Sequence, residues 1–139
     1  MTINTPLLIN LPCFLDHRGS LSVVERHKDI PYAISRVYWI YGVPPGERRG
    51  AHAHRSLSQL LVAVNGSFSV TVDDGREKTL FALTNPSEGL YIPPGVWGTL
   101  HDFSADAVCL VLASASYEED DYIRSYDDFI TLKRSQRDD

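Results

Sequence analysis

Hydrophobic and polar residues alternate in short runs over the middle of the chain, from about residue 20 to residue 113. The clearest run is SFSVTV (67–72), in which Phe68, Val70 and Val72 alternate with serine and threonine, as in a β-strand with one buried face. Further runs rich in β-branched and aromatic residues, separated by Gly, Pro, Asp and Asn, cover residues 21–26, 33–41, 59–64, 78–83, 89–94 and 107–113. This spacing predicts an all-β sandwich or barrel.

Turn-forming residues separate these runs. Asp-Asp-Gly at 73–75 predicts a hairpin, and the Asn-Gly pair within 64–67 predicts a second turn. Residues 43–50 contain two prolines and two glycines, which predict a loop. Because this loop leads directly into a pair of histidines, we expect it to face a ligand.

The polar segment after residue 115 has a different pattern. Tyr122, Tyr126, Phe129 and Ile130 fall at a weak helical spacing, which predicts a short C-terminal helix, and residues 134–139 are expected to fray. The chain has 139 residues and no internal repeat, so we expect a single domain over residues 1–139.

Composition excludes several classes of protein. Hydrophobic residues make up 43% of the chain and charged residues 22%, which is typical of a globular protein. The net charge of −5 argues against non-specific nucleic-acid binding. No apolar run has the length of a membrane span, and the N-terminus does not resemble a signal peptide. Cys13 and Cys109 lie far apart with no CxxC partner, which suits a reducing compartment, so we expect a cytoplasmic protein.

The segment GERRGAHAHR (46–55) contains the candidate chemistry. Residues i and i+2 of a strand point to the same face with Cα atoms roughly 6.6 Å apart. His52 and His54 are therefore expected to share a face, where they could bind a metal, contact a substrate or simply lie side by side.

The spacing Gly46-x5-His52-x-His54-x4-Gln59-x6-Gly66 resembles the first motif of the cupin superfamily, except that Gln59 stands where metal-binding members carry glutamate. The second cupin motif places a further histidine ligand where this chain has Gly98. Only two imidazoles then remain for a divalent metal, which prefers additional anionic or thiolate donors. We therefore predict no metal, and acid–base work for the histidines, which titrate near neutral pH.

Longer stretches of the chain resemble a narrower family, the metal-free sugar-nucleotide 3,4-ketoisomerases, or dTDP-4-keto-6-deoxyglucose ketoisomerases, labelled WxcM-like. The similarity extends from about residue 10 to residue 130 and is most specific in RGAHAHRSLSQ (49–59) and DYIRSYDDF (121–129). It implies a cupin fold, that is, a double-stranded β-helix or jelly-roll barrel, with no cofactor.

The implied reaction moves a keto group from C4 to C3 of a dTDP-linked 4-keto-6-deoxyhexose through an enediol, ahead of transamination to an amino sugar. His52 and His54 are the expected acid and base, without a decision between them. Tyr38 is expected to relay a proton or polarise the carbonyl.

The same resemblance suggests residues that bind the substrate. Arg49 is expected to bind the diphosphate, because a guanidinium pairs well with phosphate oxygens, and Arg124 is a second candidate. Arg36 shares strand parity with Tyr38. The other expected site residues are Gln59, Tyr91, Trp97 and His101. Several family members carry histidine at the position of Gly98. The role of that histidine is absent here or is taken by another group such as His101.

Several alternatives stay open at this point. They are a metal-dependent cupin, a dTDP-sugar 3,5-epimerase and a non-catalytic carbohydrate-binding cupin. The stereochemistry at C4 is also undecided. We further expect a homodimer, with exchange of N-terminal strands, and neither a nucleic-acid nor a membrane partner.

Overall fold

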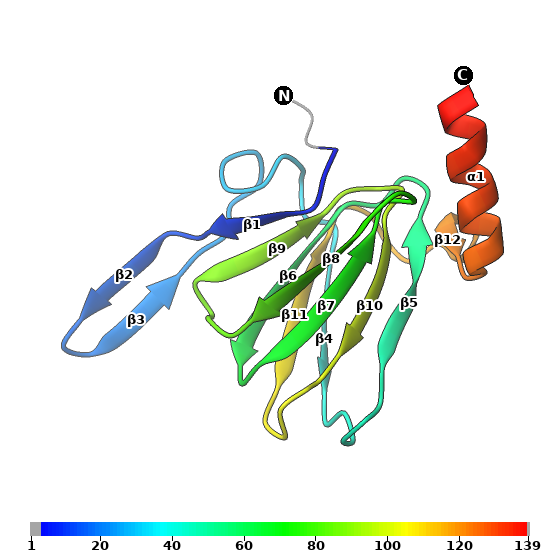
Figure 1. Cartoon of the computed structure of the whole chain (residues 1–139). Coiled ribbons are helices and arrows are strands. Elements are labelled where there is room, and N and C mark those ends of the chain that lie inside the picture. Colours follow the sequence, from blue (N-terminus) through cyan, green and yellow to red (C-terminus); the bar gives the residue numbers. More distant parts are fainter. Residues whose placement is uncertain (1–3, 139) are drawn as a thin grey trace.

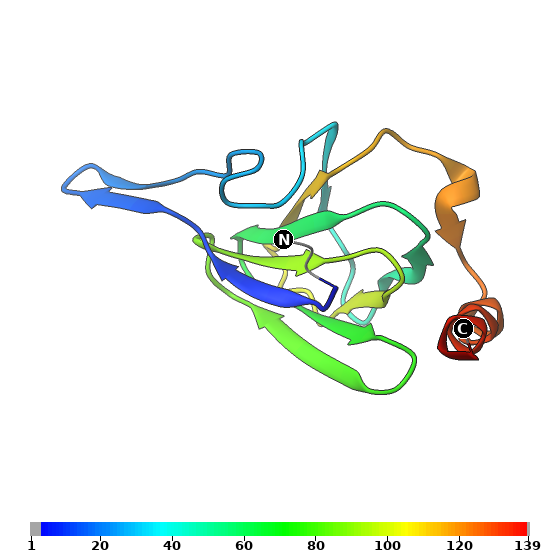
Figure 2. The same ribbon diagram turned by 90° about the horizontal axis from the view of Figure 1, so that it is seen from above.

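Two five-stranded antiparallel sheets form the body of the protein in a computed structural model that describes residues 4–138. The first sheet has the order β1 (Leu7–Asn10), β9 (Glu88–Ile92), β6 (Gln59–Asn65), β11 (Val108–Ala113), β4 (Arg36–Tyr41). The second has the order β12 (Tyr122–Ile123), β5 (Arg49–His54), β10 (Trp97–His101), β7 (Phe68–Asp73), β8 (Lys78–Leu83). The sheets face each other and enclose an interior that is visible from above in Figure 2. The predicted all-β jelly roll is confirmed.

The core between the sheets follows from the alternation seen in the sequence. On β7, Phe68, Val70 and Val72 are buried, whereas Ser69 and Thr71 are partly exposed on the opposite face. The inward side chains of several strands and their connections join them in one cluster of buried residues: Leu61, Ala63, Leu83, Leu90, Ile92, Val96, Leu100, Cys109 and Val111. Burial of this apolar surface is the main force that holds the two sheets together.

The turn predictions are confirmed, with one difference in what the turns connect. β7 pairs with β8 from Asp73 to Lys78, as expected for a hairpin. The turn at 64–67 instead carries the chain from β6 in the first sheet to β7 in the second. Of the predicted strand at 21–26, only Leu21 and Ser22 belong to β3 (Gly19–Ser22). β10 was missed, because its sequence WGTLH is poor in β-branched residues.

A C-terminal helix, α1 (Tyr126–Asp138), lies beside β12 and β5 at one side of the body (Figure 1). Phe129 is fully buried there with Ala53 and Ile123, which anchors the helix to the second sheet. Tyr122 was expected in this helix but forms β12, which pairs with β5. The helix extends to Asp138, and the fraying expected for residues 134–139 stays a prediction.

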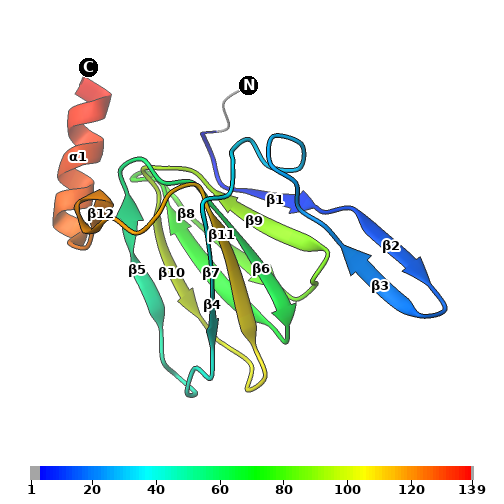
Figure 3. The same ribbon diagram turned by 180° about the vertical axis from the view of Figure 1, so that it is seen from behind.

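The N-terminal segment forms a hairpin of β2 (Cys13–Asp16) and β3 that projects away from the body on the side opposite α1 (Figures 1 and 3). Phe14, Leu15 and Leu21 of this hairpin are largely exposed. Among residues 4–138 there is no helix long and apolar enough to cross a membrane.

Candidate active site

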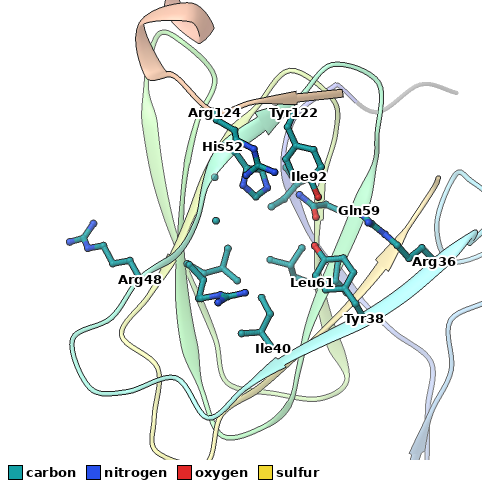
Figure 4. Close-up of a pocket in the computed structure, with 15 residues that line it drawn as sticks. Arg36, Tyr38, Ile40, Arg48, His52, Gln59, Leu61, Ile92, Tyr122 and Arg124 are labelled. Atoms are coloured by element: carbon teal, nitrogen blue, oxygen red, sulfur yellow. The ribbon is translucent and has the colours of Figure 1, made fainter. Parts of the chain in front are cut away.

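A cavity of about 510 Å³ lies between the two sheets, directly beside the core. Four core residues, Leu61, Ile92, Leu100 and Val111, form its apolar wall. The remaining lining residues are polar, aromatic or glycine: Arg36, Tyr38, Arg48, Arg49, Gly50, His52, Gln59, Gly98, Tyr122 and Arg124, with Ile40 (Figure 4). A volume of this size and mixed character is typical of a small-molecule site.

The backbone of β5 is kinked just before the first histidine. Gly50 and Ala51 both have positive φ angles, 84° and 58°, and the pairing of β5 with β10 shifts register between Gly98 and Thr99. A Cβ atom on Gly50 would lie 3.1 Å from the carbonyl oxygen of Gly98, so a glycine is needed for this approach. Beyond the kink, His52 lines the cavity, whereas Ala53 faces the buried cluster beneath α1.

His52 and His54 do not occupy equivalent positions. His52 lines the cavity, but His54 is 3% exposed and does not line it. Their ring centroids are 4.9 Å apart in an edge-to-face arrangement. Burial, and next the neighbouring His54, lower the pKa of His52 to about 4, so its imidazole is neutral and able to accept a proton at neutral pH.

Asp121, in the 3-10 helix η1 (Glu119–Asp121), is hydrogen-bonded to the buried His54. Its Oδ2 lies 3.1 Å from His54 Nδ1 and accepts a hydrogen bond from the backbone N–H of Leu57 at 3.2 Å. Its Oδ1 accepts hydrogen bonds from the backbone N–H and the hydroxyl of Ser56, at 2.8 and 2.6 Å. Although burial opposes it, these hydrogen bonds hold the pKa of Asp121 below its ordinary value. The carboxylate is therefore ionised at neutral pH.

Tyr122 packs against both histidines, with centroid distances of 4.9 Å to His52 and 4.4 Å to His54. The guanidinium of Arg124 stacks on the Tyr122 ring, 4.3 Å from its centroid. Arg124 is held in place by Glu119, which accepts hydrogen bonds from Nε at 2.7 Å and from a terminal nitrogen at 2.9 Å. The segment after β11 thus contributes both an aromatic wall and a fixed cation.

Tyr38, on β4, extends its hydroxyl into the cavity toward Gln59 (Figure 4). Burial, with a further contribution from Tyr122, raises the pKa of Tyr38 to about 12, so the phenol keeps its proton throughout the physiological range. The guanidinium carbon of Arg36 lies 5.0 Å from the centroid of the Tyr38 ring. Tyr38 is therefore a neutral proton donor beside a cation.

The cavity is strongly cationic. Arg36, Arg48, Arg49 and Arg124 line it, and no aspartate or glutamate is among the 15 described residues that do so. Figure 4 shows the side chain of Arg48 directed away from the cavity. The Nε atom of Arg36 is buried and has no hydrogen-bond partner within residues 4–138. The charges favour an anionic ligand.

The donor set does not suit a divalent metal. His52 and Gln59 line the cavity, position 98 has no side chain, and the Nδ1 atom of His54 is already bound to Asp121. Within the described part of the chain, no three side chains of His, Cys, Asp or Glu are grouped so that they could hold a metal ion. We assign no step to a metal.

Six of the ten site residues expected from the sequence line the cavity: Arg36, Tyr38, Arg49, His52, Gln59 and Arg124. His54 lies behind it. Three others, Tyr91, Trp97 and His101, point away from the cavity, because the adjacent residue along the same strand faces it. Tyr91 alternates with Ile92 and packs on the outer side of the first sheet near Tyr32.

The other two residues that point elsewhere are on β10, where Gly98 and Leu100 face inward. Trp97 packs against α1, 5.8 Å from the Phe129 ring by centroids. The His101 Nε2 atom lies 2.7 Å from the Thr71 hydroxyl oxygen. We expected that His101 could take the role of the histidine that is absent at position 98. Its position outside the cavity does not support this expectation.

The sequence interpretation missed Tyr122, Asp121 and Glu119. Tyr122 was predicted to lie in the C-terminal helix, and no role was predicted for the two acids. A signal was present in the segment DYIRSYDDF, whose similarity to the ketoisomerase family included Asp121 and Tyr122 as well as Arg124.

Comparison with known proteins identifies relatives over nearly the whole chain. The family described as WxcM-like, C-terminal matches residues 4–134. A TDP-4-oxo-6-deoxy-alpha-D-glucose-3,4-oxoisomerase from Aneurinibacillus thermoaerophilus is 49% identical over 122 residues, which is 88% of each chain.

Solved structures agree with this result. A 3,4-ketoisomerase from Helicobacter canadensis is 39% identical with a TM-score of 0.91, covering 95% of this chain and 99% of the other. A variant of the Thermoanaerobacterium thermosaccharolyticum 3,4-ketoisomerase QdtA in complex with TDP-4-keto-6-deoxyglucose is also 39% identical, with a TM-score of 0.92 and coverage of 96% and 97%. The three relatives described above are 3,4-keto- or 3,4-oxoisomerases, and the chain belongs to the WxcM-like family.

Proposed function

We propose that this protein is a 3,4-ketoisomerase that converts dTDP-4-keto-6-deoxyglucose into a dTDP-3-keto-6-deoxyhexose. The observation that carries this proposal is the cavity itself. It combines a neutral imidazole, a protonated phenol and several arginines in a chain whose relatives are named for this reaction. The product would serve deoxyamino-sugar biosynthesis, because a 3-keto group is a substrate for transamination.

The reaction needs only proton transfers. A base removes the proton from C3 while O4 gains a proton, which gives a 3,4-enediol. The proton on O3 then leaves and C4 receives a proton, so that C3 becomes the ketone and C4 the alcohol. Carbon C3 is oxidised and carbon C4 is reduced within one molecule, so no external oxidant or reductant is required.

We assign the C3 base to His52 rather than to His54. His52 lines the cavity and is neutral at neutral pH, whereas His54 is buried behind it with Nδ1 held by Asp121. Tyr38 is assigned as the donor to O4, because its phenol stays protonated and extends into the same cavity. This division of labour was left open by the sequence.

The arginines are assigned to the diphosphate. Arg49 and Arg124 supply guanidinium groups at the cavity, and such groups pair with phosphate oxygens in a bidentate manner. Arg36, whose buried Nε lacks a partner in the described chain, would gain one from an anionic or carbonyl oxygen. Gln59 offers an amide that can bind a sugar hydroxyl.

Incubation with dTDP-4-keto-6-deoxyglucose in deuterated buffer, followed by NMR, tests the assignment. We expect a 3-keto product with solvent deuterium at C4 and none at C5. Deuterium at C5 would instead indicate a 3,5-epimerase. Binding of the nucleotide sugar without turnover would indicate a carbohydrate-binding protein, and turnover lost on chelation and restored by a divalent metal would indicate a metal-dependent cupin.

A homodimer belongs to the same proposal. Val37, Trp39 and Tyr41 lie on the outer face of β4, an edge strand of the first sheet, and Trp39 is 58% exposed. The projecting β2–β3 hairpin adds further exposed apolar side chains, which would be buried if it reached onto a second copy. Light scattering should give twice the chain mass, and a monomer would refute this part.

A cytoplasmic location is also proposed, and the two unpaired cysteines support it.

A further inference from the structure

One nitrogen of each imidazole in the histidine pair is buried and unpaired among the residues described. His52 Nδ1 and His54 Nε2 are both buried, and neither has a hydrogen-bond partner within residues 4–138. Buried polar atoms are almost always paired, because an unpaired one loses its hydration without compensation. The two atoms belong to neighbouring rings with centroids 4.9 Å apart, so each ring offers the other a partner. The Gly50 carbonyl is a second acceptor near His52 and favours its protonated form.

The tautomer of His54 follows from its contact with Asp121. An ionised carboxylate only accepts hydrogen bonds, so the hydrogen between the two groups must be on His54 Nδ1. In a neutral imidazole the other nitrogen then has a free lone pair. Burial lowers the pKa of His54 although Asp121 raises it, so the neutral form is the one present at neutral pH. His54 Nε2 is therefore a buried acceptor.

His52 has the complementary arrangement. Its Nδ1 is buried, so Nε2 is the nitrogen that can reach a ligand in the cavity. To accept a proton there, Nε2 must have a free lone pair, which places the hydrogen of the neutral ring on Nδ1. Two imidazoles joined by an N–H···N bond of normal length have centroids about 5 Å apart. The observed separation of 4.9 Å allows this bond after a rotation of the rings.

We propose that Asp121 and His54 form a buried relay behind His52, which holds His52 in the tautomer that accepts the C3 proton and stabilises the imidazolium that results. The hydrogen bonds run from His52 Nδ1–H to His54 Nε2, and from His54 Nδ1–H to Asp121. Both Asp121 and His54 are positioning residues, since neither lines the cavity. The inference rests on the proposed function of His52 as the base.

The charges around the two rings show why a carboxylate is needed at this place. Arg36 and Arg124 both disfavour a positive charge on His54, and Arg124 also disfavours one on His52. Glu119 favours the charge on His52 but is paired with Arg124. Tyr122 packs against both rings. Asp121 is the carboxylate in direct contact with the histidine pair among the residues described.

The first test is the protonation state of His54 in the free wild-type protein. Two-bond ¹H–¹⁵N spectra of protein labelled with ¹⁵N-histidine distinguish the two tautomers. We expect His54 to be protonated at Nδ1 and unprotonated at Nε2 at pH 7. The opposite tautomer or an imidazolium would overturn the relay. This outcome does not depend on turnover, so it is separable from a failure of the proposed function.

The second test is Asp121→Asn, with Ser56→Ala as the matched control. The oxygen of the new amide can keep the Ser56 bonds, and its NH₂ group would then donate to His54 Nδ1, which inverts the tautomer as in the corresponding substitution of a serine-protease triad. The same NH₂ group can no longer accept the hydrogen bond from the Leu57 backbone N–H. We expect kcat to fall about 100-fold or more with KM changed less than about threefold, and the Nε2–H tautomer to appear. Ser56→Ala removes one hydrogen bond from the same carboxylate without touching His54, and should keep kcat within about threefold.

Two results would overturn the relay. One is a folded Asp121→Asn protein with wild-type kcat, and the other is an equal loss of kcat in Ser56→Ala, which would indicate a structural role only. If Asp121→Asn does not fold, the relay is tested by the histidine spectrum of the wild-type protein together with the activity of Asp121→Glu. The longer carboxylate can still accept from Nδ1, so it should retain more activity than any neutral substitution that folds.

Discussion

The guanidinium of Arg124 lies 4.3 Å from the centroid of the Tyr122 ring, and the same ring lies 4.9 Å from His52 and 4.4 Å from His54 by centroids. A cation is thereby fixed close to the proposed base, where its charge disfavours a second positive charge on His52. The contact brings together the second sheet and the segment after β11, which local sequence patterns do not connect. It also defines which arginines should matter for substrate binding.

Replacement of Arg124 by alanine should mainly weaken binding. The guanidinium lines the cavity and is held by Glu119, so its loss removes a positioned partner for a phosphate oxygen. We expect KM for the dTDP-sugar to rise roughly 10- to 100-fold, with a smaller change in kcat. Arg76→Ala is the matched control, because Arg76 is an exposed arginine between β7 and β8 that does not line the cavity. Steady-state kinetics distinguish them, and equal effects would contradict the assignment.

Tyr38→Phe should reduce the rate of the chemical step. The substitution keeps the ring and its contact with Arg36 but removes the hydroxyl that we assign to O4. General acid catalysis contributes typically 10²- to 10⁴-fold, so kcat should fall by about 10²-fold or more with little change in KM. Tyr91→Phe serves as the control, because Tyr91 is buried on the outer side of the first sheet. A Tyr38→Phe enzyme as active as the Tyr91→Phe enzyme would exclude Tyr38 as the acid.

The free energy of unfolding should fall as the pH falls from about 6.5 to about 4. Burial holds the pKa of His52 at about 4 and lowers that of His54, whereas both titrate near 6.5 in the unfolded chain. The unfolded state therefore binds more protons in this window, and stability is lost as the pH falls. For His52 alone the loss reaches up to about 3 kcal/mol.

Urea denaturation at pH 7.5, 5.5 and 4.5 measures this dependence. In His52→Gln the slope between pH 6.5 and 4 should be smaller, because one of the two titrating groups is gone. Stability that is constant over the window, or that rises toward low pH, would show that the histidines are not desolvated as described.

Much of the fold could be predicted from the sequence, because the alternation of side chains along a strand depends only on neighbouring residues. Alternation on β7 places Phe68 and Val70 inward, and the same two-residue period puts His52 and His54 on a common face of β5. Local pattern does not decide which of two neighbouring residues faces a cavity when both are apolar or aromatic. Tyr91 was therefore chosen over Ile92.

Other features depend on contacts between distant segments. His54 and Asp121 are 67 positions apart, and their hydrogen bond exists only because β12 pairs with β5. On β10 the inward position next to Trp97 is Gly98, which has no side chain to reveal its orientation. Tyr122 had helical spacing but is in a strand, because pairing with β5 outweighs a weak periodic signal.

Substrate deuterated at C3 provides the most direct measurement of the central claim, that His52 removes the C3 proton in a 3,4-ketoisomerase reaction. The wild-type protein should release this deuterium to solvent as the 3-keto product forms. His52→Asn should bind TDP with an affinity close to that of the wild type but release deuterium at least about 10³-fold more slowly. His101→Asn, altered outside the cavity, should behave as the wild type. Retention of the C3 deuterium by the wild-type protein, or its release at an unchanged rate by His52→Asn, would contradict the account.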